Sequence, residues 1–262
     1  MEGIQVQDRA IITPGEVIAT GMDYIPSMGT YRDKERIIAN KLGMVHIEGR
    51  AIKVIPLSGR YMPKVGDMII GQVIDISMSG WRIELNCAYS AMISLKDATS
   101  DFIERGADLT QYYNLGDYMI AEIVNVTSQK LVDLSTRGPG MRKLQGGRII
   151  TVNPNKVPRV IGKQGSMVGL IKDATGCRIT VGQNGIIHIQ GTPKQEMLAA
   201  ETIHKVEQES HFSGLTDKIK AYLEQRVKEM QLDPTPLIID EPPRERPMQQ
   251  RRGPPRFSRG RR

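Results

Sequence analysis

Aromatic residues and cysteines are scarce in this chain of 262 residues. It has three Phe, one Trp and two Cys, so its cores must be built from Ile, Val, Leu and Met. The two cysteines, Cys87 and Cys177, stand alone in or beside predicted strands, which favours buried reduced thiols over a disulfide framework or a metal site. No apolar run approaches the length of a membrane span, and the first residues lack the basic and then apolar pattern of a signal peptide. We therefore expect a cytoplasmic protein with no membrane contact.

Motifs of catalysis are also missing. The sequence contains no Gly-x-x-x-x-Gly-Lys-Ser/Thr, no His-Glu-x-x-His and no nucleophile elbow. Acidic residues are spread singly apart from Asp240-Glu241, whereas two-metal nuclease chemistry needs a cluster of carboxylates. None of the histidines has metal-ligand spacing, so we interpret all of them as surface or structural residues: His46, His188, His204 and His211. The sequence predicts no catalytic residue, no metal and no cofactor.

The net charge of +7 is unevenly distributed along the chain. Residues 1–141 carry 14 basic and 17 acidic side chains, and residues 195–243 carry 5 and 10. Between them, residues 142–194 carry 9 basic side chains and 1 acidic one. The last residues, 244–262, carry 8 Arg and 1 Glu. A basic segment of this kind is typical of nucleic-acid contact, because it offers counter-charge to phosphates.

The basic segment also holds the motif Gly162-Lys163-Gln164-Gly165. Ser166 is a candidate N-cap for the helix after the motif, and Gly176 ends that helix. The elements that we expect are a strand, a short helix, the Gly-x-x-Gly loop, a helix, two strands and a helix. We place the strands at residues 148–152, 178–182 and 186–190, the turn between the last two at Asn184-Gly185, and the last helix from Thr192-Pro193 onward. This is the order of a KH domain, which we place at residues 142–209.

The Gly-x-x-Gly loop has the chemistry of a phosphate clamp. Two glycines let the backbone turn sharply with no Cβ in the way, and the next helix directs its N-terminal N–H groups toward phosphates. A KH loop of this type clamps the backbone of single-stranded nucleic acid. The candidate RNA-binding residues are the loop and the basic residues before it: Lys156, Arg159, Gly162, Lys163, Gln164 and Gly165. An ordinary corner between two helices would also need small residues, so the prediction depends on the flanking order of elements.

Residues 63–137 predict a five-stranded barrel. The expected strands are residues 68–77, 81–85, 91–94, 118–127 and 131–135. A polar excursion at residues 96–114 separates the third strand from the fourth, which matches an OB fold. The block resembles the S1 RNA-binding family through Val65-Gly66-Asp67, Gly71-x-Val73, the turn Ser79-Gly80 and the later Leu115-Gly116-Asp117.

The predicted face of this barrel departs from the S1 pattern. S1 domains usually place two aromatic residues and a histidine where bases stack. Here Trp81 and Arg82 are the candidate RNA-binding residues, and Ser94 stands where histidine is common. Stacking contributes roughly 1–3 kcal/mol per base, so we expect weaker and less selective binding. For Trp81 two interpretations stay open, a base-stacking residue or a partly buried residue of the barrel.

The two ends of the chain differ from the middle. Residues 1–60 have short β-like runs between turn residues and few apolar side chains, which predicts a small antiparallel β domain that needs a partner surface. A helix at residues 210–232 has apolar residues at helical spacing for core or interface contact. Pro, Arg and Gly dominate residues 233–262, so we expect a disordered tail that is either solvated or in contact with RNA. The predicted fold class is a multidomain β and α+β protein, with a small N-terminal antiparallel β domain, an S1-type five-stranded OB barrel and a KH domain with a C-terminal helix.

This order of modules resembles the S1/KH cap subunit of the archaeal RNA exosome, over about residues 8–230. Pro14-Gly15-Glu16, Gly29-Thr30-Tyr31 and the loop at residues 160–165 match that family. The resemblance implies a non-catalytic role, in which three cap chains sit on a hexameric ring of phosphorolytic subunits. It also implies that the N-terminal domain docks on the ring and that the S1 domains line a pore for single-stranded RNA.

Two other functions stay open. A polynucleotide phosphorylase of the bacterial type also combines KH and S1, but in the opposite order and after two catalytic domains that are missing here. A free translational or regulatory RNA-binding protein would use the same modules without a ring. Size determination with candidate ring subunits separates that function from the cap.

Overall fold

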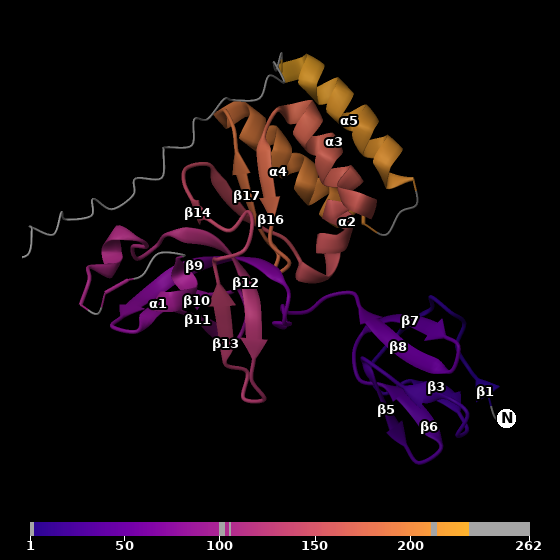
Figure 1. The fold of residues 1–262 in the computed structure, drawn as a ribbon. Helices are drawn as coiled ribbons and strands as arrows, with labels where there is room; N and C mark the ends of the chain where they lie inside the picture. The colour runs from indigo at the N-terminus through magenta and orange to yellow at the C-terminus, as the bar shows by residue number, and fades with distance from the viewer. Residues whose placement is uncertain (1–2, 100–102, 105, 211–213, 231–262) are drawn as a thin grey trace, which may run out of the picture.

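The computed structural model describes residues 3–99, 103–104, 106–210 and 214–230. Along these residues the chain forms an N-terminal β module, a β-barrel and a KH domain whose helices lie against a sheet (Figure 1). The predicted combination of β and α+β modules is therefore confirmed. The predicted tail and His211 lie outside the described residues. Within the ranges described, no helix has both the length and the apolar character needed to cross a membrane.

Over residues 3–56 the N-terminal module consists of two sheets packed on a small core of Ile, Val and Ala side chains. The first sheet has the order β1-β3-β6-β5 and the second β2-β7-β8-β4. The strands are β1 (Gly3–Ile4), β2 (Ile11–Ile12), β3 (Val17–Thr20), β4 (Ile25–Pro26), β5 (Thr30–Asp33), β6 (Arg36–Ala39), β7 (Gly43–Glu48) and β8 (Ala51–Pro56). One pairing departs from the antiparallel arrangement that we expected, because β4 runs parallel to β8.

The S1-type barrel closes because β13 pairs with both β12 and β11. Its elements are β9 (Met68–Ser77), β10 (Gly80–Glu84), β11 (Ser90–Ser94), α1 (Leu95–Ala98), η1 (Leu109–Gln111), β12 (Tyr118–Val126) and β13 (Val132–Ser135). The start of β10 requires glycine, since a Cβ on Gly80 would lie 1.9 Å from the carbonyl oxygen of Ile93 on β11. Inward side chains of alternating residues fill the barrel, among them Trp81, Ile83 and Ile93.

The KH domain has an antiparallel sheet of order β15-β17-β16. Its elements are β15 (Arg148–Thr151), η2 (Pro154–Lys156), α2 (Val157–Ile161), η3 (Lys163–Gly165), α3 (Ser166–Thr175), β16 (Arg178–Val181), β17 (Ile186–Gln190), α4 (Pro193–Gln208) and α5 (Leu215–Met230). A capping box between Thr192 and Gln195 starts α4, with Pro193 in its first turn. The apolar stripe of α5 joins the KH core through Leu215, Ile219 and Leu223.

The barrel and the KH domain are joined by an ordered segment. Strand β14 (Lys143–Leu144) pairs with the start of β12, and Lys143 forms an ion pair with Asp117 of the barrel. A separate apolar cluster lies between the two modules and draws side chains from both of them: Ile70, Ile120, Met141, Leu144 and Ile186. The two modules therefore share a core of their own, in addition to the chain that connects them.

Candidate nucleic-acid interface

The Gly-x-x-Gly loop connects α2 to α3 through backbone conformations that favour glycine. Gly162 has φ 75° and ψ 173°, and Gly165 has φ 80° and ψ 10°. A Cβ on Gly162 would lie 2.6 Å from the backbone N of Met167, whereas a Cβ on Gly165 would meet nothing within 4 Å. Gly162 thus allows the two helices to pack closely. Gly165 leaves open space where a phosphate could approach the backbone.

Helix α3 begins beside this space without a side-chain cap. Our prediction that Ser166 caps the helix is wrong, because Ser166 is already the first helical residue and Gly165 holds the N-cap position. The positive end of the helix dipole therefore faces the loop, and no side chain of the N-cap residue accepts a hydrogen bond from the first turn. This is the arrangement by which a helix N-terminus binds an anionic oxygen.

The predicted basic residues differ in what they contact. Lys163 and Gln164 are exposed at the tip of the loop, and Arg159 is exposed on α2. Lys156 is half-buried, and its Nζ donates a hydrogen bond to the backbone oxygen of Glu207 at 3.0 Å. That contact places the charge of Lys156 at the C-terminal end of α4, where a cation is favourable. The structure therefore brings Arg159, Lys163 and Gln164 to the surface and gives Lys156 a structural bond.

Trp81 does not form a stacking surface. It is 0% exposed, its Nε1 donates a hydrogen bond to the backbone oxygen of Tyr113 at 3.1 Å, and its ring meets the rings of Tyr112 and Tyr113 edge-on. The interpretation of Trp81 as a base-stacking residue is wrong, because no face of the indole reaches solvent. Arg82 follows on the strand and points outward, opposite Asp75 of β9.

The histidines have the structural or surface positions that we expected, within the part of the chain that is described. His188 is buried in β17 with its Nε2 2.8 Å from the carbonyl oxygen of Gly146, and burial lowers the pKa of its imidazole. In the N-terminal module the Nδ1 of His46 lies 3.6 Å from a carboxylate oxygen of Asp8. Over the described ranges, no group of three or more His, Cys, Asp or Glu side chains is arranged to hold a metal ion.

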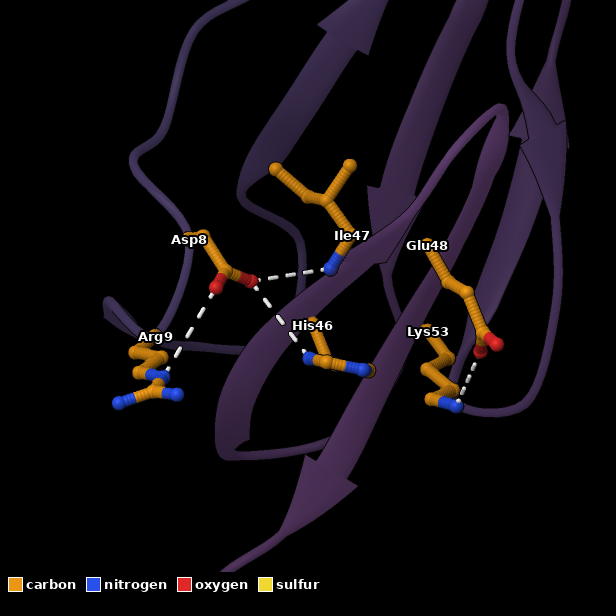
Figure 2. A network of polar contacts seen from close by, with 6 residues as sticks. All are labelled: Asp8, Arg9, His46, Ile47, Glu48 and Lys53. Atoms are coloured by element: carbon orange, nitrogen blue, oxygen red, sulfur yellow. Dashed lines mark hydrogen bonds and ion pairs between the residues drawn. The ribbon is translucent and has the colours of Figure 1, made fainter.

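The outer face of the β2-β7-β8 sheet carries an apolar row that we did not predict. Ile11, Met44 and Ile55 are cross-strand neighbours on adjacent strands, and Ile11 is 67% and Ile55 39% exposed. Two residues further along β7 and β8 the same face becomes ionic, where Figure 2 shows Asp8, His46 and Lys53 with their partners. We call Ile11, Met44 and Ile55 the apolar row. The sequence shows the three strands separately. Only the register between them, which the structure provides, aligns these three residues in a row.

The chain combines an S1-type barrel with a KH domain, and the two modules share a core. The KH domain exposes a Gly-x-x-Gly loop. These features define the class of S1/KH proteins. Family models match the modules in the same order. They are the exosome RNA binding protein RRP4 N-terminal domain at residues 9–58, the RRP4 S1 domain at residues 60–125 and the KH domain at residues 147–205.

Similar proteins extend over nearly the whole chain. Exosome complex component Rrp4 of Pyrococcus abyssi is 39% identical over 250 residues, which cover 92% of this chain and 94% of that protein. The protein of the same name from Methanopyrus kandleri is 39% identical, over 84% of this chain and 95% of its own length. A crystal structure of a candidate exosome complex RNA-binding protein has a TM-score of 0.61 and 29% identity, over 66% of this chain and 99% of that one. The chain belongs to the Rrp4 family.

Proposed function

We propose that this chain is a non-catalytic cap subunit of an exosome complex, which captures single-stranded RNA and feeds it to a hexameric phosphorolytic ring. The observation that supports this most is the open loop at residues 162–165 in a chain whose relatives are named Exosome complex component Rrp4. The complex would hold three copies of the chain and would act in the cytoplasm. Catalysis would belong to the ring.

The RNA side of this proposal depends on the KH loop. Gly165 leaves room for a phosphate, the start of α3 offers N–H groups, and Lys163 adds a positive charge beside them. The barrel is less suited to hold RNA by itself, since residues 61–141 carry 6 basic and 10 acidic side chains. We therefore assign the first capture of RNA to the KH loop and a guiding role to the barrel.

The ring side depends on the N-terminal module. Two of the three side chains of its apolar row, Ile11 and Ile55, are exposed and Met44 between them is half-buried, and apolar side chains gathered on a sheet face favour contact with another protein. The polar residues on the same face, Asp8, His46 and Lys53, would border such a contact, as polar side chains do at the rim of interfaces. We assign ring docking to this face.

The experiment combines size determination with an RNA-shortening assay. The purified chain is mixed with candidate ring subunits and passed over a sizing column, and each fraction is incubated with labelled single-stranded RNA, phosphate and Mg²⁺. We expect the chain to co-elute with the ring, to shorten no RNA alone and to increase RNA shortening by the ring. Shortening that survives repurification of the chain would disprove the non-catalytic role. Failure to co-elute would favour a free RNA-binding protein.

A further inference from the structure

A groove lies where the segment that enters the barrel passes the start of the KH helices. It has a volume of about 430 Å³, which falls within the range of small-ligand sites, roughly 300–1,000 Å³. Both modules contribute to its walls, which include Arg60 and Tyr61 before β9, Asn86 after β10, and Thr151, Asn153 and Pro154 from the end of β15 to η2. The groove is therefore a feature of the assembled chain and of neither module alone.

Three side chains of this groove have polar groups that the protein itself does not use. Arg60 and Thr151 are exposed, and Asn86 is half-buried. Among the residues that the structure describes, none forms a hydrogen bond or an ion pair with these three side chains. A guanidinium, a carboxamide and a hydroxyl are thus left to bind water or a ligand.

Other contacts hold the walls of the groove in place. The hydroxyl of Tyr61 donates to a carboxylate oxygen of Asp67 at 2.5 Å. The side chain of Asn153 caps η2, and its backbone N–H donates to the carboxylate of Glu207 at 2.7 Å. Asn86 has a φ of 58°, a left-handed conformation that asparagine tolerates better than most residues. A groove whose walls are fixed in advance loses little conformational entropy when a ligand enters.

The chemistry of the groove favours a nucleotide. Arg60 offers a planar cation for a phosphate, and none of the residues that line the groove in the described structure carries a carboxylate. Pro154 and Val152 add apolar surface for a base. The carboxamide of Asn86 can both donate to and accept from the edge of a base, which is how exposed bases of single strands are bound.

The position of the groove beside the Gly-x-x-Gly loop points to RNA. The helices η2 and α2 lead directly from Pro154 in the groove to Gly162 in the loop, and Arg159 is exposed between them. The 3 residues of η2 and the 5 of α2 rise by about 12–16 Å. At a stacked spacing of about 3.4 Å per nucleotide, this length equals about four nucleotides. One strand of about 12 nucleotides is therefore long enough to contact the loop and the groove together.

We propose that this groove binds one nucleotide of the RNA strand that the Gly-x-x-Gly loop holds. Arg60 contacts its phosphate, and Asn86 and Thr151 form hydrogen bonds with its base or sugar. This inference rests on the proposed RNA-binding function. A strand held at both places binds more tightly than a strand held at the loop alone, because the second contact becomes intramolecular.

The test measures the salt dependence of RNA affinity on the full chain. Arg60→Ala is compared with Lys64→Ala, an exposed lysine outside the groove that gives the same change in net charge. For an RNA of about 12 nucleotides, Arg60→Ala should lower the slope of log affinity against log salt by about 0.7, the contribution of one phosphate contact on a single strand. It should also bind this RNA roughly fivefold more weakly at low salt, whereas Lys64→Ala should behave as wild type. A four-nucleotide RNA, about the length that one KH loop clamps, should bind both variants as it binds wild type.

Two further variants and a crosslink locate the contact. Asn86→Gly removes the carboxamide and keeps the left-handed backbone, and Thr151→Trp fills the groove from an exposed position. Both should weaken binding of the longer RNA only. RNA that carries 4-thiouridine should crosslink to residues 59–61 or 151–154 in the wild type and lose this crosslink in Thr151→Trp.

The possible failures are distinguishable. Equal salt slopes for wild type and Arg60→Ala, or crosslinks confined to residues 162–165, would overturn the groove as an RNA site and leave the proposed function standing. Unchanged RNA binding with lost co-elution with the ring in these variants would also overturn it, because the groove would then contact protein. A wild-type chain that binds neither RNA would overturn the proposed function and this inference with it.

Discussion

The N-terminal module and the KH domain differ in how many large apolar side chains they expose to solvent. Within residues 3–60, nine large apolar side chains are exposed: Ile4, Ile11, Met22, Ile25, Met28, Tyr31, Leu42, Ile55 and Leu57. In the described part of residues 142–230 only Met197 is exposed to this degree. The KH domain instead exposes charge, with 9 basic side chains and 1 acidic one over residues 142–194. The comparison supports our proposals that the N-terminal module contacts another protein and that the KH domain contacts an anion.

The cores of the two modules also differ, because the N-terminal core is built from smaller side chains and is the smaller of the two. Over the described residues the fully buried side chains of the N-terminal core are Ile, Val and Ala, whereas the KH core adds Leu and Met from three helices. A small core leaves little free energy to spare, so a module of this kind gains most from burial against a partner. The KH domain can rely on its own core and keep its loop free.

The largest effect that we expect comes from charging the apolar row. Ile11→Asp together with Ile55→Asp should abolish co-elution with ring subunits and leave the RNA affinity of the isolated chain unchanged. Burying an Ile side chain contributes about 1.5–3 kcal/mol, so losing two of them should weaken docking by at least about 100-fold. Met78→Asp in the barrel is the matched control, since Met78 is 96% exposed and lies outside the N-terminal module. Retained co-elution of the double variant would place docking elsewhere.

The second prediction concerns charge reversal in the KH loop, which should weaken RNA binding and not docking. Lys163→Asp with Gln164→Asp puts two carboxylates beside the start of α3, where phosphates are expected. Affinity for single-stranded RNA should fall by roughly 1–3 kcal/mol through lost charge-assisted contacts, while co-elution with the ring persists. Lys194→Asp together with Met197→Asp, two exposed positions on α4, also lowers the net charge by three and controls for that change. Unchanged RNA binding with an intact fold would mean that the loop does not hold RNA.

A smaller effect distinguishes the two glycines of the loop. Gly162→Ala should destabilise the folded chain by about 1–3 kcal/mol, because its Cβ would lie 2.6 Å from Met167 N in a backbone conformation that favours glycine. Gly165→Ala has free space around its Cβ and should cost only about 1 kcal/mol of backbone strain. Urea unfolding of both variants measures the difference. Equal losses would show that packing at Gly162 is not the constraint.

The smallest effect concerns acid sensitivity of the KH core. Burial lowers the pKa of His188 from about 6.5, and the charges of Arg142 and Arg178 act in the same direction, while the hydrogen bond to the Gly146 carbonyl and the charge of Glu196 oppose them. The unfolded chain therefore takes up a proton at higher pH than the folded chain does, so stability falls as the pH drops below about 6.5, by at most about 1.4 kcal/mol per pH unit. Urea unfolding at about pH 7.5 and pH 5.5 should show a smaller loss in His188→Gln than in wild type. His204→Gln, on the exposed face of α4, should behave as wild type.

The barrel and KH strands were predictable because local signals and tertiary contacts agree there. The strands predicted at residues 68–77 and 186–190 are β9 and β17 as observed. In the N-terminal module β5 was missed, since Thr30–Asp33 is mostly polar and becomes a strand only by pairing with β6. β1 and β4 are two-residue strands with too few residues to show a pattern.

The parts of the candidate site that lie within one short segment could be predicted from the sequence. The parts that depend on how separate strands pair could not. The Gly-x-x-Gly loop forms from four consecutive residues, and these residues together with the order of the helices and strands around them indicated it. Trp81 alternates with Ile83 and Leu85, all buried, so strand periodicity could have placed it inside the barrel. The apolar row needs the pairing of β2, β7 and β8, so it could not be found from any one segment of the sequence.

The contact between the barrel and the KH domain also bears on how the chain is made. Beside the apolar cluster that joins them, the side-chain amide of Asn184, in the turn between β16 and β17, forms hydrogen bonds with backbone groups of Ile70 and Leu85. These residues stand 114 and 99 positions earlier in the chain, so the barrel precedes the KH turn in synthesis. At about 5–20 residues per second, the backbone groups of Ile70 wait roughly 6–23 seconds for residue 184 to be added. During that interval a nascent barrel presents water with the side of β9 that the turn will later cover. In a ribosome-bound chain this side of β9 is therefore open to non-native pairing, and synthesis of the turn ends that exposure.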